Sequence, residues 1–172
     1  MYIIVGLGNP GEEYARTRHN TGRMAEEYIS NHTEKLPVKF IFLDTFMNKS
    51  GSGVAKAVKS KKAAEKLIVI HDDLDLPLGS LKISYGRGSG GHKGVESIIK
   101  AIKTKDFIRI RIGISLPAGR QGKTKGDVEK HILGQFKKSE MEILKKVFKR
   151  ASEAVQMIIK EGLAPAMTEF NK

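Results

Sequence analysis

Short apolar runs recur along the chain and predict strands. The five runs that carry this signal cover residues 2–5, 38–43, 67–70, 81–85 and 107–114. The run at 67–70 is apolar on both faces, which is typical of a central strand with helices above and below it. In the last run, isoleucines alternate with Arg109 and Arg111, which indicates a strand with one buried face.

Stretches with helical periodicity lie between these runs. They predict a helix that begins at Asn20 or Thr21, a short helix that begins near Ser50, a helix that includes residues 95–102, and a long helix that begins at Ser139. For the last helix, Glu142 is expected to complete a capping box with Ser139, and Gly162 is expected to end it.

Strands that alternate with helices predict an α/β fold. We expect residues 1–172 to form a single domain, a three-layer αβα sandwich around a mixed, mostly parallel twisted sheet. A length of 172 residues fits one domain with a substantial core. The chain shows neither an internal repeat nor a linker, and its one biased tract covers residues 118–126.

The composition narrows the functional classes. The chain has no Cys, which excludes a disulfide framework and a thiolate metal site and fits a reducing compartment. No apolar run approaches the roughly 20 residues of a membrane span, and residues 2–5 are too short for a signal peptide. We therefore expect a soluble cytoplasmic protein. No hydrophobic seam demands a partner subunit, so a monomer is expected.

The positive charge is concentrated in the second half of the chain. The net charge is +12; residues 1–86 hold 12 Lys and Arg against 10 Asp and Glu, whereas residues 87–172 hold 19 against 9. Such a field attracts polyanions, including nucleic acids, although a solvated lysine-rich surface would look the same.

The segment Gly6-x-Gly8-x-x-Gly11 follows a predicted strand and matches the dinucleotide-binding pattern. Several features argue against that interpretation. Pro10 offers no N–H group to a phosphate, and Glu12 and Glu13 would place negative charge beside it. The helix that the pattern requires at the turn is also missing, and so is an acidic residue about 20 positions further on.

His19 follows this turn in a polar loop and is a candidate general base, because an imidazole titrates near neutral pH. Asp72 belongs to the segment His71-Asp72-Asp73-Leu74-Asp75, which directly follows the run at 67–70. If the strands at 2–5 and 67–70 are parallel, Asp72 and His19 share one rim of the sheet, where the carboxylate would orient the ring. A structural acidic loop is the alternative. A metal site built from histidine and the acidic residues 72, 73 and 75 is a weaker one, because nothing fixes the ligand spacing.

Other candidates lie in turns and in a second glycine-rich loop. Asn9 and Asn48 could hold a carbonyl or an ester, or could simply form Asx turns. The loop at 86–94 carries Arg87, His92 and Lys93 ahead of a helix, where free N–H groups and cations suit a phosphate or a nucleic acid backbone. A mobile gate or an idle loop would have the same composition.

Taken in order, these segments resemble the bacterial-type peptidyl-tRNA hydrolase family. The resemblance covers about two-thirds of the chain and rests on the following segments: Val5-Gly6-Leu7-Gly8-Asn9-Pro10-Gly11, Tyr14, Thr17-Arg18-His19-Asn20, Thr45-Phe46-Met47-Asn48-x-Ser50-Gly51, His71-Asp72-Asp73-Leu74-Asp75-Leu76-Pro77-x-Gly79, Gly90-Gly91-His92-x-Gly94 and Arg109-x-Arg111-Ile112-Gly113-Ile114.

The resemblance implies hydrolysis of the ester between a peptide and the 3′ end of tRNA, with tRNA as the partner and without a metal or a cofactor. It implies that His19 is the general base and that Asp72 supports it. The substrate-binding residues would be Asn9, Tyr14, Phe46, Asn48, His92 and Lys93. The cations for tRNA phosphates would be Lys82, Arg87 and Arg111.

Three departures from the family pattern stand out. Lys93 occupies a position where the family usually has Asn. The stretch between Ile29 and Thr45 is shorter than in typical members, which is expected to remove a strand or hairpin and expose a sheet edge. Ser84 replaces a frequent phosphate-binding lysine, for which Arg87 or the loop with Arg120, Lys123 and Lys125 could compensate. A catalytically silent RNA-binding module is the alternative function, and a dinucleotide-dependent enzyme is a third.

Overall fold

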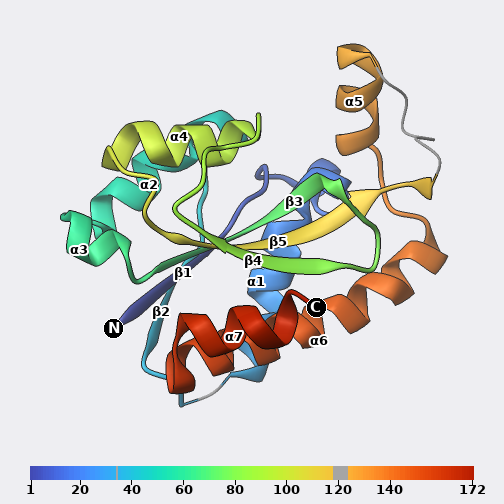
Figure 1. The fold of residues 1–172 in the computed structure, drawn as a ribbon. Helices are drawn as coiled ribbons and strands as arrows, with labels where there is room; N and C mark the ends of the chain where they lie inside the picture. The colour runs from blue at the N-terminus through green and yellow to red at the C-terminus, as the bar shows by residue number, and fades with distance from the viewer. Residues whose placement is uncertain (34, 118–123) are drawn as a thin grey trace.

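The computed structural model describes residues 1–33, 35–117 and 124–172. Its centre is a five-stranded sheet in the order β2-β1-β3-β5-β4 (Figure 1). The strands are β1 (Tyr2–Gly6), β2 (Val38–Ile41), β3 (Leu67–Pro77), β4 (Leu81–Tyr85) and β5 (Ile108–Ser115). β1 pairs in parallel with β2 and β3, and β3 pairs in parallel with β5, while β4 is antiparallel to β5. The mixed, mostly parallel sheet expected from the sequence is thus confirmed.

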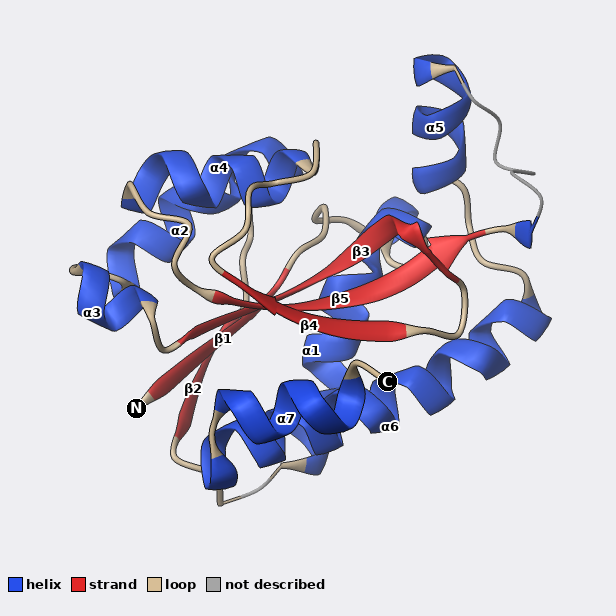
Figure 2. Ribbon diagram, viewed as in Figure 1, coloured by secondary structure: helices blue, strands red, loops and turns tan. Residues whose placement is uncertain are grey.

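Helices cover both faces of the sheet and make the three layers visible in Figure 2. One face is covered by α1 (Thr21–His32), α6 (Lys138–Glu161) and α7 (Leu163–Phe170), and the other by α2 (Ser50–Ala57), α3 (Lys61–Ala64) and α4 (Lys93–Ile102). Each face has its own apolar core, because strand residues that point to opposite sides pack with different helices. A further helix, α5 (Lys125–Ile132), projects away from these layers (Figure 1).

The glycines of the first turn allow α1 to pack closely on the strands. A Cβ atom on Gly6 would lie 2.2 Å from the carbonyl oxygen of Gly22, and one on Gly22 would lie 2.1 Å from that of Ile70. The helix begins at Thr21, after two single-turn 3₁₀ helices, η1 (Glu12–Tyr14) and η2 (Arg18–Asn20). The glycine pattern therefore serves backbone packing, and the helix start that a dinucleotide requires at the turn is absent from this described segment.

β3 is longer than the sequence indicates. The apolar run ends at Ile70, but the strand continues to Pro77 because His71, Asp72 and Asp73 keep pairing with β5. A register irregularity follows between Asp73 and Pro77. The alternative that this acidic segment is a loop is therefore wrong, since the segment continues the strand.

The beginning of α6 also differs from expectation. The helix begins at Lys138, and the carboxylate of Glu140 accepts a hydrogen bond from the backbone N–H of Lys137 at 2.7 Å. The predicted capping box of Ser139 and Glu142 is therefore wrong by two residues. Gly162 ends the helix as expected, with a φ of 104°. The helices α3, α5 and α7 were not predicted.

The two edge strands of the sheet are β2 and β4, and a side chain covers part of β4. On β4, the side-chain amide of Asn171 accepts from the backbone N–H of Ile83 at 2.7 Å and donates to its carbonyl at 2.8 Å. On the opposite side of the sheet, β2 is only four residues long. Phe42 just beyond it is 60% exposed.

Candidate active site

A pocket of about 1210 Å³ opens at the carboxyl ends of the parallel strands. In α/β sheets, ligands bind at this end because the loops there converge. The walls come from the turn after β1, from η3 (Met47–Lys49), from the acidic half of β3, from the loop between β4 and α4, and from α5. Among the predicted site residues, its lining includes Asn9, His19, Phe46, Asn48, Asp72, Arg87, His92, Lys93 and Arg111.

Asp72 joins two imidazoles at the base of this pocket. Its Oδ2 atom lies 2.8 Å from Nδ1 of His19, and its Oδ1 atom lies 2.8 Å from Nε2 of His92. All three residues have little solvent contact. The predicted proximity of His19 and Asp72 is therefore observed, and the parallel pairing of β1 with β3 is its cause.

The pKa values follow from this arrangement. Burial acts to raise the pKa of Asp72, but the charge of His19 and the hydrogen bonds from His19 and His92 outweigh it and hold the pKa below its usual range. Burial acts to lower the pKa of His19, but the charge and hydrogen bond of Asp72 outweigh it, so the pKa is raised in spite of the opposing charge of Lys93. An ionised carboxylate only accepts hydrogen bonds. His19 therefore donates from Nδ1, and its neutral form carries the lone pair on Nε2.

His92 is fixed in one tautomer. Its Nε2 atom donates to Asp72, while its Nδ1 atom accepts from the backbone N–H groups of Gly94 at 3.1 Å and Val95 at 3.4 Å. Both ring nitrogens are thus engaged within the protein. The expectation that free N–H groups at this helix start would hold a phosphate is wrong for these two groups, because His92 caps them.

His71 completes the set of buried rings. Its Nδ1 atom donates to the carbonyl oxygen of Asp72 at 2.7 Å, and its ring lies edge-on to His92 at a centroid distance of 4.7 Å. Burial keeps its pKa well below the usual value, so it is neutral. The sequence predicts no separate role for His71. The residue follows the predicted strand, and only the motif around it indicates a function.

Asn9 is held from three sides. Its backbone N–H donates to Oδ1 of Asn20 at 2.8 Å, and its carbonyl accepts from Nδ2 of Asn20 at 2.9 Å and from Arg23 at 3.1 Å. The side-chain Oδ1 of Asn9 accepts from the backbone N–H of Met47 at 2.8 Å. The Nδ2 group is then the polar group that this side chain can offer to a substrate. The supporting role of Asn20 was not foreseen.

The predicted aromatic residues lie at one side of the site. Phe46 is 54% exposed and lines the pocket, and the ring of Tyr14 packs edge-on against it at a centroid distance of 6.3 Å. Tyr14 is not among the described lining residues. Exposed apolar rings of this kind suit the stacking of an unpaired base.

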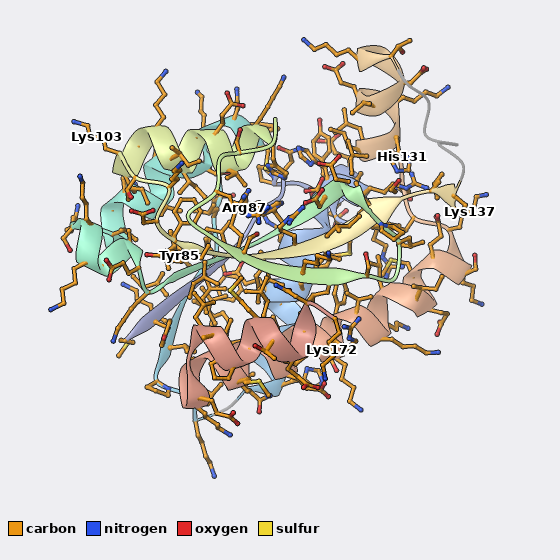
Figure 3. All side chains as sticks on the ribbon, in the orientation of Figure 1. Tyr85, Arg87, Lys103, His131, Lys137 and Lys172 are labelled. Carbon is orange, nitrogen blue, oxygen red and sulfur yellow. The ribbon has the colours of Figure 1, made fainter. Side chains whose placement is uncertain are left out.

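The predicted phosphate-binding cations differ in their availability. Arg87 lies on the loop between β4 and α4 (Figure 3), and Lys82 is exposed on β4 opposite Arg111 of β5. Arg111 already forms an ion pair with Asp73, with Nε and Oδ2 2.6 Å apart. Of the cations considered as replacements for the missing lysine at Ser84, Lys125 lines the pocket, while Arg120 and Lys123 lie outside the described residues.

The same cluster offers ligand atoms for a metal ion. His19, Asp72 and His92 place one ligand atom each within 4.8 Å of one another, and in the described structure they are the only set of three or more that does so. Two imidazoles and one carboxylate would suit a transition metal. In the metal-free arrangement, however, each imidazole N–H already has the carboxylate as its partner.

The site defines a class of protein. A buried carboxylate that raises the basicity of an imidazole, with a free ring nitrogen at a large open pocket, is the arrangement of a hydrolytic enzyme that activates water by general base catalysis. Among the described residues, no helix is long and apolar enough to span a membrane.

Comparisons with known proteins identify the family. The family model described as peptidyl-tRNA hydrolase matches residues 3–40 and 33–172. The peptidyl-tRNA hydrolase of Thermodesulfovibrio yellowstonii is 41% identical over 192 residues, with all of both chains covered. That of Syntrophotalea carbinolica is 38% identical over 190 residues, covering 99% of this chain and 97% of the relative. A crystal structure of peptidyl-tRNA hydrolase from Acinetobacter baumannii superposes with a TM-score of 0.86 at 31% identity, covering 99% of this chain and 94% of that one.

This chain therefore belongs to the peptidyl-tRNA hydrolase family, as the sequence motifs predicted. The match to the relative from Thermodesulfovibrio yellowstonii spans 20 more positions than this chain has residues. The family model matches in two separate segments that overlap at residues 33–40. This break falls within the stretch between Ile29 and Thr45 that was expected to be short, next to the edge strand β2.

Proposed function

We propose that this protein hydrolyses the ester that joins a peptide, or an N-blocked amino acid, to the 3′ end of tRNA, and so recycles peptidyl-tRNA released from ribosomes. The observation that carries the proposal is the His19–Asp72 pair at the base of the pocket, in a chain whose full-length relatives are peptidyl-tRNA hydrolases.

In the proposed reaction, Nε2 of His19 takes a proton from a water molecule as the water attacks the ester carbonyl. The ionised Asp72 stabilises the imidazolium that forms, because its carboxylate already accepts the hydrogen bond from Nδ1. The imidazolium then gives the proton to the ribose oxygen as the ester bond breaks. Proton transfer therefore returns His19 to its starting state in each turnover.

The remaining site residues have proposed roles in binding. The Nδ2 group of Asn9 is suited to donate to the substrate's carbonyl oxygens, which become more negative in the transition state. Asn48 and Lys93 border the same pocket and are suited to bind the end of the tRNA, and Phe46, supported by Tyr14, to stack on a base. Lys82, Arg87 and Arg111 would contact phosphates. His92 would have two roles. Its ring nitrogens hold Asp72 and cap α4, and its ring would also contact the substrate.

We further propose that the enzyme acts as a cytoplasmic monomer and uses neither a metal nor a cofactor. The hydrogen bonds of Asp72 support the metal-free reaction, since a metal held by the same atoms would replace the N–H groups of both histidines.

The direct test measures release of N-acetylated amino acid from N-acetyl-aminoacyl-tRNA. The native protein should release it, and His19→Ala should be slower by about 10²- to 10⁴-fold, the usual contribution of a general base. Arg150→Met, at an exposed position of α6, is the control for unrelated effects. Binding of tRNA without hydrolysis would instead indicate a silent RNA-binding module, and equal rates for the native and His19→Ala proteins would rule out the proposed base.

A further inference from the structure

Arg18 directly precedes the proposed base. Its side chain contacts the C-terminal end of α5, the helix that projects away from the sandwich. The residue is buried, with 8% of its surface exposed. Its Nη1 atom donates to the carbonyl oxygen of His131 at 3.3 Å, and its Nη2 atom pairs with Oε1 of Glu140 at 3.1 Å. A single guanidinium therefore connects the loop that carries His19 with the last turn of α5 and the first turn of α6.

The two helix ends are suited to this cation. The carbonyl of His131 belongs to the partially negative C-terminal end of α5. Glu140 is the acidic residue that caps the start of α6 through the backbone N–H of Lys137. Arg18 thus binds one carbonyl at the helix end, which also accepts from the N–H of Gly134 at 3.1 Å, and one carboxylate, and the planar fork of arginine can reach both at once.

The backbone around Arg18 reinforces the connection. The N–H of Arg18 donates to the carbonyl of Gly134 at 3.0 Å, and the N–H of Phe136 donates to the carbonyl of Arg16 at 3.1 Å. Thr17 forms an isolated antiparallel bridge with Gln135. The ring of Phe136 lies 5.4 Å from the guanidinium carbon of Arg18. The segment between α5 and α6 is therefore attached to the His19 loop through three consecutive residues, Gly134, Gln135 and Phe136.

Gly134 provides the space for the guanidinium. A Cβ atom at this position would lie 2.7 Å from Nη1 of Arg18 and 3.1 Å from the carbonyl oxygen of Lys130. Contacts under 3.0 Å force a displacement. A side chain at position 134 would thus press on Arg18 without removing any of its bonding groups.

α5 has few other attachments to the body of the protein among the described residues. It stands apart from the layers of the sandwich in Figure 1, and its His131 donates to the carbonyl of Ile114 at 2.9 Å at the end nearest the sheet (Figure 3). The helix nevertheless contributes Val128 and Ile132 to the wall of the pocket that contains His19, and Leu133 directly after the helix lines it too. How α5 is held therefore determines the shape of the pocket.

We infer that Arg18 is a positioning residue that fixes α5 relative to His19, through the carbonyl of His131 and the carboxylate of Glu140, and so sets the width of the substrate pocket. Its effect on turnover rests on the proposed function. Its effect on the placement of α5 does not, and the two can be measured separately.

The placement of α5 can be measured by electron paramagnetic resonance between two spin labels. The chain has no Cys, so Lys130→Cys on α5 and Lys149→Cys on α6, both exposed, give two unique labelling sites. The distance distribution should be narrow in the otherwise native protein and broader or shifted in Arg18→Met. Arg150→Met makes the same change at an exposed position of α6 and should leave the distribution unchanged.

The kinetic test uses the same variants without labels. Arg18→Met should lower kcat/KM for N-acetyl-aminoacyl-tRNA on the order of 10- to 100-fold, because misplacement of a binding wall by about 1 Å can have an effect of this size. The pH at which activity is half-maximal should stay the same, because the contact between His19 and Asp72 remains. A general loss of structure would instead lower the fraction of active protein and leave the KM of the remainder unchanged.

Gly134→Ala tests the same role if Arg18→Met does not fold. It retains Arg18 and Glu140 and should broaden the distance distribution and lower kcat/KM in the same direction, by a smaller factor. The inference is overturned if both folded variants keep the native distance distribution and the native KM. If the labels move but no variant, including the native protein, hydrolyses the ester, the positioning role stands and the proposed function fails.

Discussion

Nδ1 of His19 and Oδ2 of Asp72 lie 2.8 Å apart, a relationship that sets both the tautomer and the basicity of the ring. Because Asp72 raises the pKa of His19, hydrolysis should increase with pH through a midpoint above 6.5 and reach a plateau where the imidazole is neutral. In Asp72→Asn the midpoint should move to lower pH, because the charge that stabilises the imidazolium is gone. The plateau should fall by at least about 10²-fold, since the base is weaker and its tautomer is no longer fixed.

A pH–rate profile of kcat/KM for both proteins checks this prediction. Asp75→Asn, at an exposed acidic residue of the same strand, is the control and should keep the native midpoint. A midpoint that stays in place in Asp72→Asn would contradict the role given to this carboxylate.

Lys93 should lower the basicity of the same ring. Its positive charge opposes a second positive charge on His19 and lowers the pKa of that imidazole. Lys93→Asn should therefore move the midpoint of the pH–rate profile to higher pH. Lys100→Asn, further along α4, should leave it unchanged. If the midpoint moves in the opposite direction, the influence of Lys93 on His19 is not electrostatic.

The cations on β4 and β5 should act on affinity and its salt dependence. Lys82→Ala should weaken tRNA binding and reduce the slope of log K against log salt by about 1. Asp73→Asn should release Arg111 from its ion pair and make the slope steeper. Filter binding or fluorescence titration at several salt concentrations measures both effects, with Lys146→Ala on α6 as the control. An unchanged slope in both variants would mean that the tRNA does not contact Lys82 or Arg111.

Glu26 should make the protein less stable at alkaline pH. It is fully buried on α1, where one oxygen accepts from the N–H of Gly6 at 2.9 Å, and burial raises its pKa from 4.5 to about 8 although that hydrogen bond opposes the shift. The folded state therefore holds a proton that the unfolded state releases between these values, so its contribution to stability is lost as pH rises through 8.

The free energy of unfolding in urea at pH 6 and pH 9 tests this role. The loss of stability between the two pH values should be smaller in Glu26→Gln than in the native protein, by about 3 kcal/mol. About two pKa units of the shift lie above pH 6, and one unit corresponds to about 1.4 kcal/mol. Glu27→Gln, the exposed neighbour, should behave like the native protein. An equal loss in Glu26→Gln would show that other groups cause the pH dependence.

A chelator of transition metals should leave hydrolysis unchanged at constant Mg²⁺. The atoms of His19, Asp72 and His92 that could bind a metal are occupied by hydrogen bonds to one another. The measurement compares initial rates before and after treatment with phenanthroline, followed by addition of Zn²⁺. Loss of activity that Zn²⁺ restores would mean that the cluster is a metal centre.

The sequence predicted the parts of the fold that depend on local apolar patterns. The positions of β1, β4, α1 and α2 follow from such patterns, and the approach of His19 to Asp72 followed from one assumption about parallel strands. The polar half of β3 could not be predicted in this way. His71 and Asp72 lie in a strand because β5 pairs with them, and a partner 40 residues away leaves no trace in local periodicity.

The least predictable features of the site depend on side chains that serve two elements. The family resemblance implies that His92 binds substrate, and the structure shows that its ring also caps α4 and binds Asp72. The capping pattern predicts Glu142 instead of Glu140, because it does not show that Arg18, 122 positions away, binds the carboxylate of Glu140. Such double roles become visible only when the contacts are known.

The amide of Asn171 has a consequence for the behaviour of the protein in concentrated solution. A strand with unsatisfied N–H and C=O groups along its outer side can add a strand from another molecule and start aggregation. On β4, the groups of Ile83 are already bonded by that amide, which imitates one residue of a neighbouring strand. Asn171 thus blocks the addition of another strand at Ile83, and loss of this side chain would leave these two backbone groups available to a strand of a second molecule.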